Sequence, residues 1–294
     1  MAVTARPRRS VLYMPGSNAR ALDKAKSLAA DGLIFDLEDA VAPDAKEEAR
    51  TLATRAVSGG GYGRREILVR VNGLATPWGF ADVAAAAASG ADGILIPKVE
   101  SADAVRQVES ILDNAGAPES LGLWCMMETP RGILRAEEIA QSSRRMTGFV
   151  MGTSDLAKDL HAAHTHTRLP MLVSLGHCLL AARAFGLAVI DGVHLDLADD
   201  EGFAESCRQG LELGFDGKTL IHPKTIDMAN TVFAPTEAEV AWSRKIIAAF
   251  AEAETGGKGV VVVDGKLVEN LHVANARRLV ALAEQIEAMA KDLS

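Results

Sequence analysis

The chain has 294 residues, 48% of them hydrophobic, which is enough to bury a large core and is a common length for an α/β barrel in one domain. Its formal net charge of -8 argues against general nucleic-acid binding, because phosphate neutralisation needs a broad cationic surface. No run of about eighteen apolar residues occurs, and the basic start leads into no apolar segment. We therefore expect a cytoplasmic protein without a membrane span, and three reduced cysteines, since their spacing shows no pairing.

Short apolar runs alternate with Ala- and Leu-rich stretches of helical periodicity over most of the chain. Because strands separated by helices pair in parallel, eight such units predict a closed (β/α)₈ TIM barrel, with a doubly wound open sheet as the alternative. The predicted strands are residues 10–13, 33–37, 67–71, 94–96, 121–127, 149–151, 187–190 and 219–221. Helical patterns cover residues 19–30, 45–57, 81–89, 102–114, 135–140, 172–185 and 203–213.

The last sixty residues do not fit a ninth barrel unit. A capping box from Thr236 to Glu239 starts a helix that runs to about residue 254, and a Gly-Gly break follows it. Asp264-Gly265 then joins two short apolar runs, which predicts a β-hairpin, and a final helix is expected at about 274–291. We therefore predict a catalytic barrel, residues 1–235, and a C-terminal helix-hairpin-helix arm or lid, residues 236–294.

Two carboxylates follow neighbouring strands of the predicted barrel. Glu128 ends the apolar run LGLWCMM, and Asp155 comes just after the run that ends at Met151. Active sites of these barrels lie at the carboxyl ends of the strands, and a buried acid needs a compensating cation or donors. Mg²⁺ fits, because it is commonly held by one or two carboxylates and keeps water and substrate oxygens as other ligands. The alternative is that each acid caps the helix that follows it.

Other strand ends are also polar, including Asp36 at the end of strand two, Arg70 at the end of strand three and Asp191 after strand seven, so polar groups are expected to converge on one rim. A guanidinium on an apolar strand needs an anionic partner. Arg70 is predicted to bind a substrate carboxylate, with structural pairing to Asp36 or Glu38 as the alternative. Glu38 and Asp39 are predicted to orient metal-bound water, with helix capping as the alternative.

The turn YMPGSNARALDKA places Arg20 and Lys24 four residues apart, on one face of a helix. Two cations beside a helix N-terminus can hold phosphate, although from spacing alone plain surface solubility is the better interpretation.

With these residues in place, the chain resembles the citrate lyase β-subunit-like branch of the HpcH/HpaI aldolase superfamily. The matching stretches span almost the whole chain: RSVLYMPGSNARALDKA, LIFDLEDAV, VRVNG, IPKVES, MMETPRGI, MGTSDLAKDL, GFDGKTLIHP and VVVVDGKLVENLHVANARR. The resemblance implies a Mg²⁺-dependent barrel, with Mn²⁺ possible, that acts on acyl-CoA thioesters and small oxo acids. It also implies a homotrimer or homohexamer in which the C-terminal arm closes a neighbour's active site.

The resemblance also implies roles for individual residues. Glu128 and Asp155 would bind the metal, and Arg70 would hold the carboxylate of the oxo acid. Residues implied to contact CoA or line the site are Tyr13, Arg20, Lys24, Ile221 and His222.

One position departs from the branch pattern. Lyases of the branch carry an acid/base aspartate after the hairpin, where this chain has Glu269, and the longer side chain changes the reach of the proton transfer. The leading interpretation is a Mg²⁺-dependent lyase that cleaves or forms a C–C bond in a malyl-CoA or citramalyl-CoA type substrate, with Glu269 reprotonating the enolate. The alternative is a (3S)-malyl-CoA thioesterase that yields malate and CoA. Further alternatives are a metal-dependent aldolase on free oxo acids and a citrate lyase β-like subunit that needs partners.

Overall fold

The computed structural model describes residues 5–255 and 259–292, so the expected Gly256-Gly257 break lies outside the described residues. The chain divides into two compact units. Arg8–Phe233 form one unit, and the described residues from Ala234 onward form the other with those before Arg8. Within the described ranges, no helix has both the length and the apolar character needed to cross a membrane.

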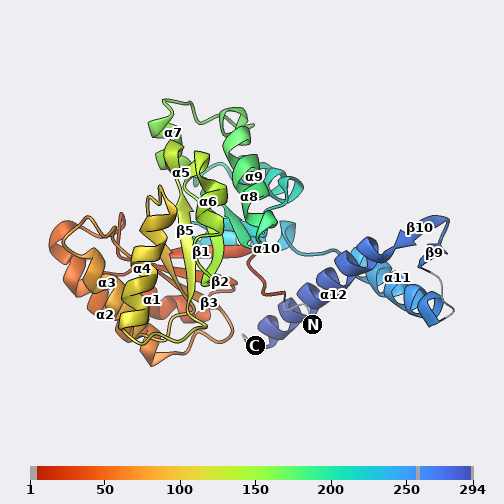
Figure 1. Ribbon diagram of the computed structural model, residues 1–294, viewed down its shortest axis with the longest axis horizontal. Helices are drawn as coiled ribbons and strands as arrows, with labels where there is room; N and C mark the ends of the chain where they lie inside the picture. The colour runs from red at the N-terminus through yellow and green to blue at the C-terminus, as the bar shows by residue number, and fades with distance from the viewer. Residues whose placement is uncertain (1–4, 256–258, 293–294) are drawn as a thin grey trace. The chain divides into compact units, whose positions relative to one another are not determined.

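The first unit is a closed barrel of eight parallel strands in sequence order, as predicted (Figure 1). Each strand pairs with the next, and β1 closes the barrel by pairing with β8, in register Val11 to Thr219. The strands are β1 (Ser10–Pro15), β2 (Gly32–Asp36), β3 (Glu66–Arg70), β4 (Gly93–Ile96), β5 (Gly122–Met127), β6 (Met146–Met151), β7 (Ala188–Asp191) and β8 (Gly217–Leu220).

Helices follow the strands and surround the barrel, so the alternation in the sequence corresponds to an inner sheet and an outer helical layer. The expected helix at 19–30 is shorter, because a 3₁₀ turn at Ala25–Ser27 replaces its end. The helices are α1 (Ala19–Lys24), α2 (Lys46–Gly59), α3 (Gly79–Ala87), α4 (Ala102–Asn114), α5 (Pro130–Leu134), α6 (Ala136–Ala140), α7 (Thr153–Asp159), α8 (Leu172–Ala184), α9 (Asp200–Leu213) and α10 (Ile226–Val232).

Alternate residues of each strand fill two separate cores. Val11, Ile34, Leu68 and Trp124 belong to the cluster inside the barrel, whereas their sequence neighbours pack between the sheet and the helices. Because side chains alternate along a strand, residues two positions beyond Ile34 and Leu68 also point inward. This periodicity places Asp36 and Arg70 inside the barrel, at the ends of their strands.

The second unit is a helix, a hairpin and a helix: α11 (Glu237–Thr255), β9 (Val260–Val263), β10 (Lys266–Glu269) and α12 (Asn270–Lys291). The two helices pack against each other and share a small core with Val263 and Val268. The capping box at Thr236 and Glu239 is confirmed, with Glu239 N donating to Thr236 Oγ1 at 3.2 Å. The predicted turn is also confirmed, since Asp264 and Gly265 both have positive φ, but α12 begins four residues earlier than expected.

Candidate functional site at the barrel mouth

Arg70 is the central cation of the barrel mouth. Its guanidinium grips Asp36 at two points, Nε to Oδ1 at 2.7 Å and Nη2 to Oδ2 at 2.6 Å, and its Nη1 lies 3.1 Å from Glu38 Oε2. Burial opposes the charge, but the hydrogen bonds to Asp36 outweigh burial, so the pKa of Arg70 is raised. The structure therefore shows the structural pairing that the sequence left as an alternative. The binding of a substrate carboxylate by Arg70 stays a prediction.

The ring of Tyr13 lies against the Arg70 guanidinium. The centre of the guanidinium is 5.0 Å from the ring centroid, a cation–π distance, and the hydroxyl donates to Met126 Sδ at 3.4 Å. Burial raises the pKa of the Tyr13 hydroxyl, so the ring stays neutral. Tyr13 therefore supports Arg70, and its contact with CoA stays a prediction.

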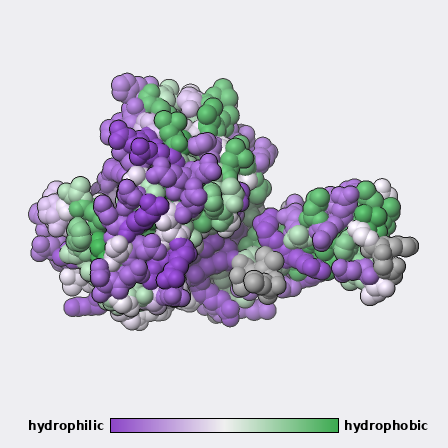
Figure 2. Space-filling view, viewed as in Figure 1, coloured by the Kyte–Doolittle hydropathy of each residue, from purple (hydrophilic) through white to green (hydrophobic). Residues whose placement is uncertain are grey.

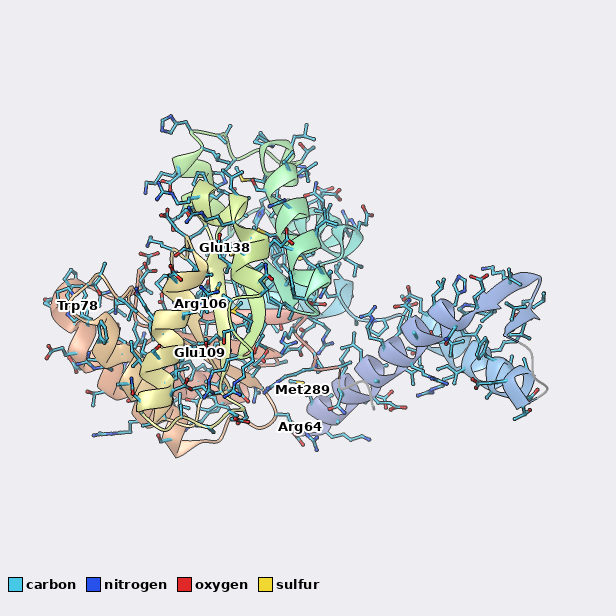
Figure 3. The ribbon with its side chains drawn as sticks, viewed as in Figure 1. Arg64, Trp78, Arg106, Glu109, Glu138 and Met289 are labelled. Carbon is cyan, nitrogen blue, oxygen red and sulfur yellow. The ribbon has the colours of Figure 1, made fainter. Side chains whose placement is uncertain are left out.

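The loop after β2 carries Glu38 and Asp39, and Lys46 binds its backbone carbonyls. The Lys46 ammonium donates to the carbonyls of Leu37 at 2.9 Å and Glu38 at 2.6 Å, and it lies 5.5 Å from the ring of Trp78. Figure 3 labels Trp78 next to the start of α3. The loop is thus anchored through backbone atoms, and the side chains of its acids are left to face the mouth.

Glu38 is nearly buried between two cations, whereas Asp39 is more than half exposed. One oxygen of Glu38 faces Arg70, and the other accepts a hydrogen bond from Lys98 Nζ. Burial raises the pKa of Glu38 and both cations oppose that rise. Asp39 lies farther from them, 3.6 Å from Arg70 Nη1 and 3.8 Å from Lys98 Nζ. Neither acid caps a helix through a side-chain hydrogen bond, so orienting water remains their predicted role.

Glu128 follows β5 and is 1% exposed. It does not cap the next helix, because Thr129 is the N-cap of α5 and accepts from Gly132 N at 3.1 Å. Its Oε1 accepts from the backbone N–H of Lys98 at 2.7 Å, while Oε2 points toward Gly152. A Cβ on Gly152 would lie 2.5 Å from Oε2, so this close approach requires glycine. Burial raises the pKa of Glu128 to about 7.

Asp155 stands in the first turn of α7, three residues after Gly152. Its side chain is 30% exposed, and Lys158 Nζ lies 4.0 Å from its Oδ1. The backbone N–H of Gly152 donates to Met127 O at 3.1 Å, which brings the starts of the two loops together. The two predicted metal ligands thus follow paired strands. One of them, Glu128, is a buried carboxylate whose Oε2 accepts no hydrogen bond from the described residues.

A divalent cation fits this donor set. Desolvation makes the charged form of Glu128 costly, and a bound cation would favour it. No group of three or more His, Cys, Asp or Glu side chains in the described part of the chain could hold a metal ion by itself. Two carboxylates would therefore leave most positions to water and substrate oxygens, as is usual for Mg²⁺.

The other four residues predicted to contact CoA or line the site are solvent-exposed. Arg20 and Lys24 are exposed on α1, the helix that follows β1. Ile221 is 43% exposed after β8, and His222 is exposed and accepts from Lys224 N through its Nδ1 at 3.1 Å. All four are therefore accessible to a large ligand, and their roles stay predictions.

Glu269 belongs to the second unit and has a structural task there. It is the N-cap of α12, where its side chain accepts from the backbone N–H of His272. In return, its own N–H donates to His272 Nδ1 at 3.0 Å. Its predicted catalytic role is thus combined with a capping role that the sequence analysis did not foresee.

Asp191 does not join the mouth, which corrects the expected convergence of strand-end acids. It is the last residue of β7 and faces α9, where Gly210 leaves room for its carboxylate. Lys218 Nζ donates to its Oδ2 at 2.8 Å, and Arg168 Nη1 lies 2.8 Å from both of its oxygens. Burial raises the pKa of Asp191, but these two cations outweigh it and lower the pKa overall. Asp191 is therefore part of an ion cluster between sheet and helices.

Two residues of the mouth were not assigned by the sequence analysis, Lys98 and Gly152. Lys98 stands at the end of β4 and contacts both Glu38 and Glu128. Its position after a strand was visible in the sequence, but its positive φ of 49° was not, because lysine rarely adopts that conformation. For Gly152, the sequence does show a glycine directly after a predicted strand, and this could have indicated a close approach of another side chain to the backbone.

The fold and the mouth define a closed parallel α/β barrel whose mouth is rich in carboxylates. A family model described as HpcH/HpaI aldolase/citrate lyase matches residues 9–223. The chain therefore belongs to that family, which confirms the resemblance.

Known proteins of this family resemble the chain over nearly its full length. A (3S)-malyl-CoA thioesterase of Cereibacter sphaeroides is 53% identical over 98% of this chain and 99% of its own. The L-malyl-CoA/beta-methylmalyl-CoA lyase of the same species is 36% identical over 97% of both chains. Protein CitE from Mycobacterium tuberculosis, in complex with magnesium, acetoacetate and coenzyme A, superposes with a TM-score of 0.74 at 28% identity, covering 96% of this chain and all of that one.

Proposed function

We propose that this protein is a Mg²⁺-dependent thioesterase that hydrolyses (3S)-malyl-CoA to malate and CoA. The observation that carries this choice is the 53% identity to a thioesterase over 98% of the chain, against 36% to a malyl-CoA lyase. The preference reverses the order in which the sequence alone placed the two reactions. The cation site is supported by the buried Glu128, whose Oε2 is turned toward Gly152 and the helix that carries Asp155.

In this proposal the chain's own residues bind and orient the substrate. Glu128 and Asp155 hold Mg²⁺, which would polarise the substrate oxygens and offset their negative charge. Arg70 binds the malyl carboxylate through Nη1, which exchanges its contact with Glu38 Oε2 for the substrate, while Nε and Nη2 stay on Asp36. Glu38 and Asp39 orient water, and Arg20 and Lys24 on α1 contact the CoA phosphates, with Tyr13, Ile221 and His222 lining the substrate.

Glu269 is proposed as the general base. It would take a proton from the water that attacks the thioester carbonyl, the C–S bond would break, and the proton would go to the CoA thiolate. A general base must lie within hydrogen-bond reach of the water, and the length of the glutamate side chain sets that reach. In this proposal residues 1–235 are the catalytic domain, and residues 236–294 are the arm or lid that closes the active site of a neighbouring copy and brings Glu269 to it.

Assembly into a homotrimer or homohexamer is proposed as well. Val262, Leu267 and Leu271 leave an apolar face of the hairpin unit exposed, and Leu134, Val173 and Leu180 do the same on α5 and α8. Figure 2 shows the hydrophobic residues gathered over these elements. Exposed apolar patches of this kind mark interaction sites, and a second copy is the proposed partner. Sedimentation velocity of the purified protein tests this assembly.

The deciding experiment is to incubate the purified protein with Mg²⁺ and (S)-malyl-CoA and to follow free thiol and glyoxylate separately. Thiol with malate and without glyoxylate supports the thioesterase. Release of glyoxylate and acetyl-CoA without thiol would establish the lyase instead. The lyase is the second candidate, because it would use the same binding residues. If neither thiol nor glyoxylate is released, the substrate is a free oxo acid or the protein needs a partner subunit. Glu128→Gln is the control, and it should abolish either activity.

A further inference from the structure

The backbone of Lys98 has an unusual conformation at the barrel mouth. Four non-glycine residues among the described ones have positive φ, and Lys98, at 49°, is the one that directly follows a barrel strand and its proline. This left-handed region costs a residue with a Cβ free energy, and such conformations persist where the surroundings hold them in place.

The conformation has a direct contact to explain it. The Lys98 N–H donates to Glu128 Oε1 at 2.7 Å. Glu128 directly follows β5, the next strand of the barrel. A hydrogen bond to a charged acceptor is among the stronger ones, and Glu128 is almost completely buried. The backbone of one loop therefore orients the carboxylate of the next.

This contact distinguishes the two oxygens of Glu128. Oε1 is taken by Lys98, whereas Oε2 faces Gly152. In the described residues, the Lys98 N–H is the only donor that reaches this carboxylate. If residue 98 could not adopt positive φ, the chain on both sides would have to shift, the N–H would lose its alignment with Oε1, and the carboxylate would lose its fixed orientation.

The side chain of Lys98 acts on a different acid. Its ammonium pairs with Glu38 Oε1 and lies 3.8 Å from Asp39 Oδ1. The two contacts can therefore be separated by mutation, because one depends on the backbone and the other on the side chain.

We propose that Lys98 is a positioning residue, whose left-handed backbone aims its N–H at Glu128 Oε1 and so keeps Oε2 directed toward Gly152 for the cation. The inference rests on the proposed cation site. Residues that orient metal ligands change metal affinity by roughly 10–100-fold when they are altered.

The test compares variants that all lack the ammonium but differ in their tolerance of positive φ. Glycine and asparagine tolerate it, whereas valine does not. We expect Mn²⁺ to bind substrate-free Lys98→Asn and Lys98→Gly with affinities within about 3-fold of each other, and Lys98→Val at least roughly 10-fold more weakly. Isothermal titration with MnCl₂ measures the affinity, and thermal unfolding checks that each variant is folded. If Lys98→Val does not fold, Lys98→Ala takes its place and should still bind more weakly than Lys98→Gly.

Equal Mn²⁺ affinity in the asparagine, glycine and valine or alanine variants would overturn the role of the backbone. The wild type and Glu128→Gln separate this result from a failure of the proposed function. If the wild type does not bind Mn²⁺, or if Glu128→Gln binds it as well as the wild type, the cation site at Glu128 is wrong and the role of Lys98 falls with it.

Discussion

Arg70 and Asp36 form a two-point ion pair inside the barrel, with Nε–Oδ1 and Nη2–Oδ2 distances of 2.7 and 2.6 Å. The two residues are directly paired in the register of β2 and β3, so the sheet itself sets their separation. Asp36 also accepts from the backbone N–H groups of Glu38 and Ala40. The pair therefore connects the strand-three cation to the loop that carries the mouth's acids.

Arg70→Lys should damage both stability and activity. Lysine keeps the charge but cannot form the two-point contact with Asp36, so we expect a loss of about 2 kcal/mol in the free energy of unfolding. The displaced charge should lower kcat/KM for malyl-CoA by roughly 100-fold. Urea unfolding and thiol release measure these effects. The matched control is Arg106→Lys on the outer helix α4, labelled in Figure 3. Arg106 pairs with the exposed Asp103, and the variant should behave as wild type.

Metal-free protein should lose stability as the pH rises through the range set by Glu128. Its pKa is raised from the ordinary 4.5 to about 7, so between these values the folded state holds a proton that the unfolded state has released. Stability from this group is complete below about 4.5 and falls by about 3 kcal/mol above pH 7. Thermal unfolding in EDTA at pH 5 and pH 8 measures the difference.

Glu128→Gln is the control for that pH effect. Glutamine cannot ionise, so the variant should show a smaller loss of stability between pH 5 and pH 8 than the wild type. Added Mg²⁺ should restabilise the wild type at pH 8 and leave the variant unchanged, because a ligand stabilises only the state that binds it. Identical pH profiles for the two proteins would contradict the raised pKa.

Gly152→Ala should disrupt the site without a change of charge. The new Cβ would lie 2.3 Å from Glu128 Cβ and 2.5 Å from its Oε2, so the carboxylate must move. We expect Mn²⁺ affinity to fall by roughly 10-fold or more. Gly176→Ala in α8 is the matched control, since its Cβ would meet nothing within 4 Å. That variant should keep the affinity and gain roughly 0.5–1 kcal/mol of stability.

Glu269 can be separated into its capping and catalytic roles. Glu269→Ala should lose about 1 kcal/mol of stability with its N-cap, together with most of the thiol release. Glu269→Asp keeps an N-cap and an acid but shortens the reach, so stability should hold while thiol release falls by roughly 10–100-fold. Unfolding and initial rates measure the two. Unchanged rates in the folded fraction of both variants would leave Glu269 as a helix cap alone.

Asp191→Asn should destabilise the barrel although the residue has no role in the proposed chemistry. It would leave Lys218, whose side chain is 0% exposed, without its carboxylate partner. Breaking a buried ion pair in this way costs about 3–5 kcal/mol. Asp103→Asn, which breaks a pair at an 81% exposed carboxylate, should change stability by less than about 0.5 kcal/mol. Chemical denaturation compares the two.

The amino-acid sequence predicted the elements well and the side-chain partners only in part. The eight apolar runs were sufficient for the barrel, because hydrophobic periodicity is a local property. Glu128 and Asp155 could be placed near each other because the carboxyl ends of parallel strands meet at one face. For Arg70 the sequence offered two kinds of partner, and the choice of Asp36 required the register of β2 and β3.

The sequence by itself determined the barrel, the hairpin arm and the acids that follow strands five and six. Only the tertiary structure decided which strand-end side chains face the mouth. Asp191 shows why: a shift of one residue along a strand turns a side chain from the inside of the barrel to the helices, and sequence-based strand ends are not that precise. The hydrogen bond from the Lys98 N–H to Glu128 likewise joins residues thirty positions apart, which a local sequence pattern does not reveal.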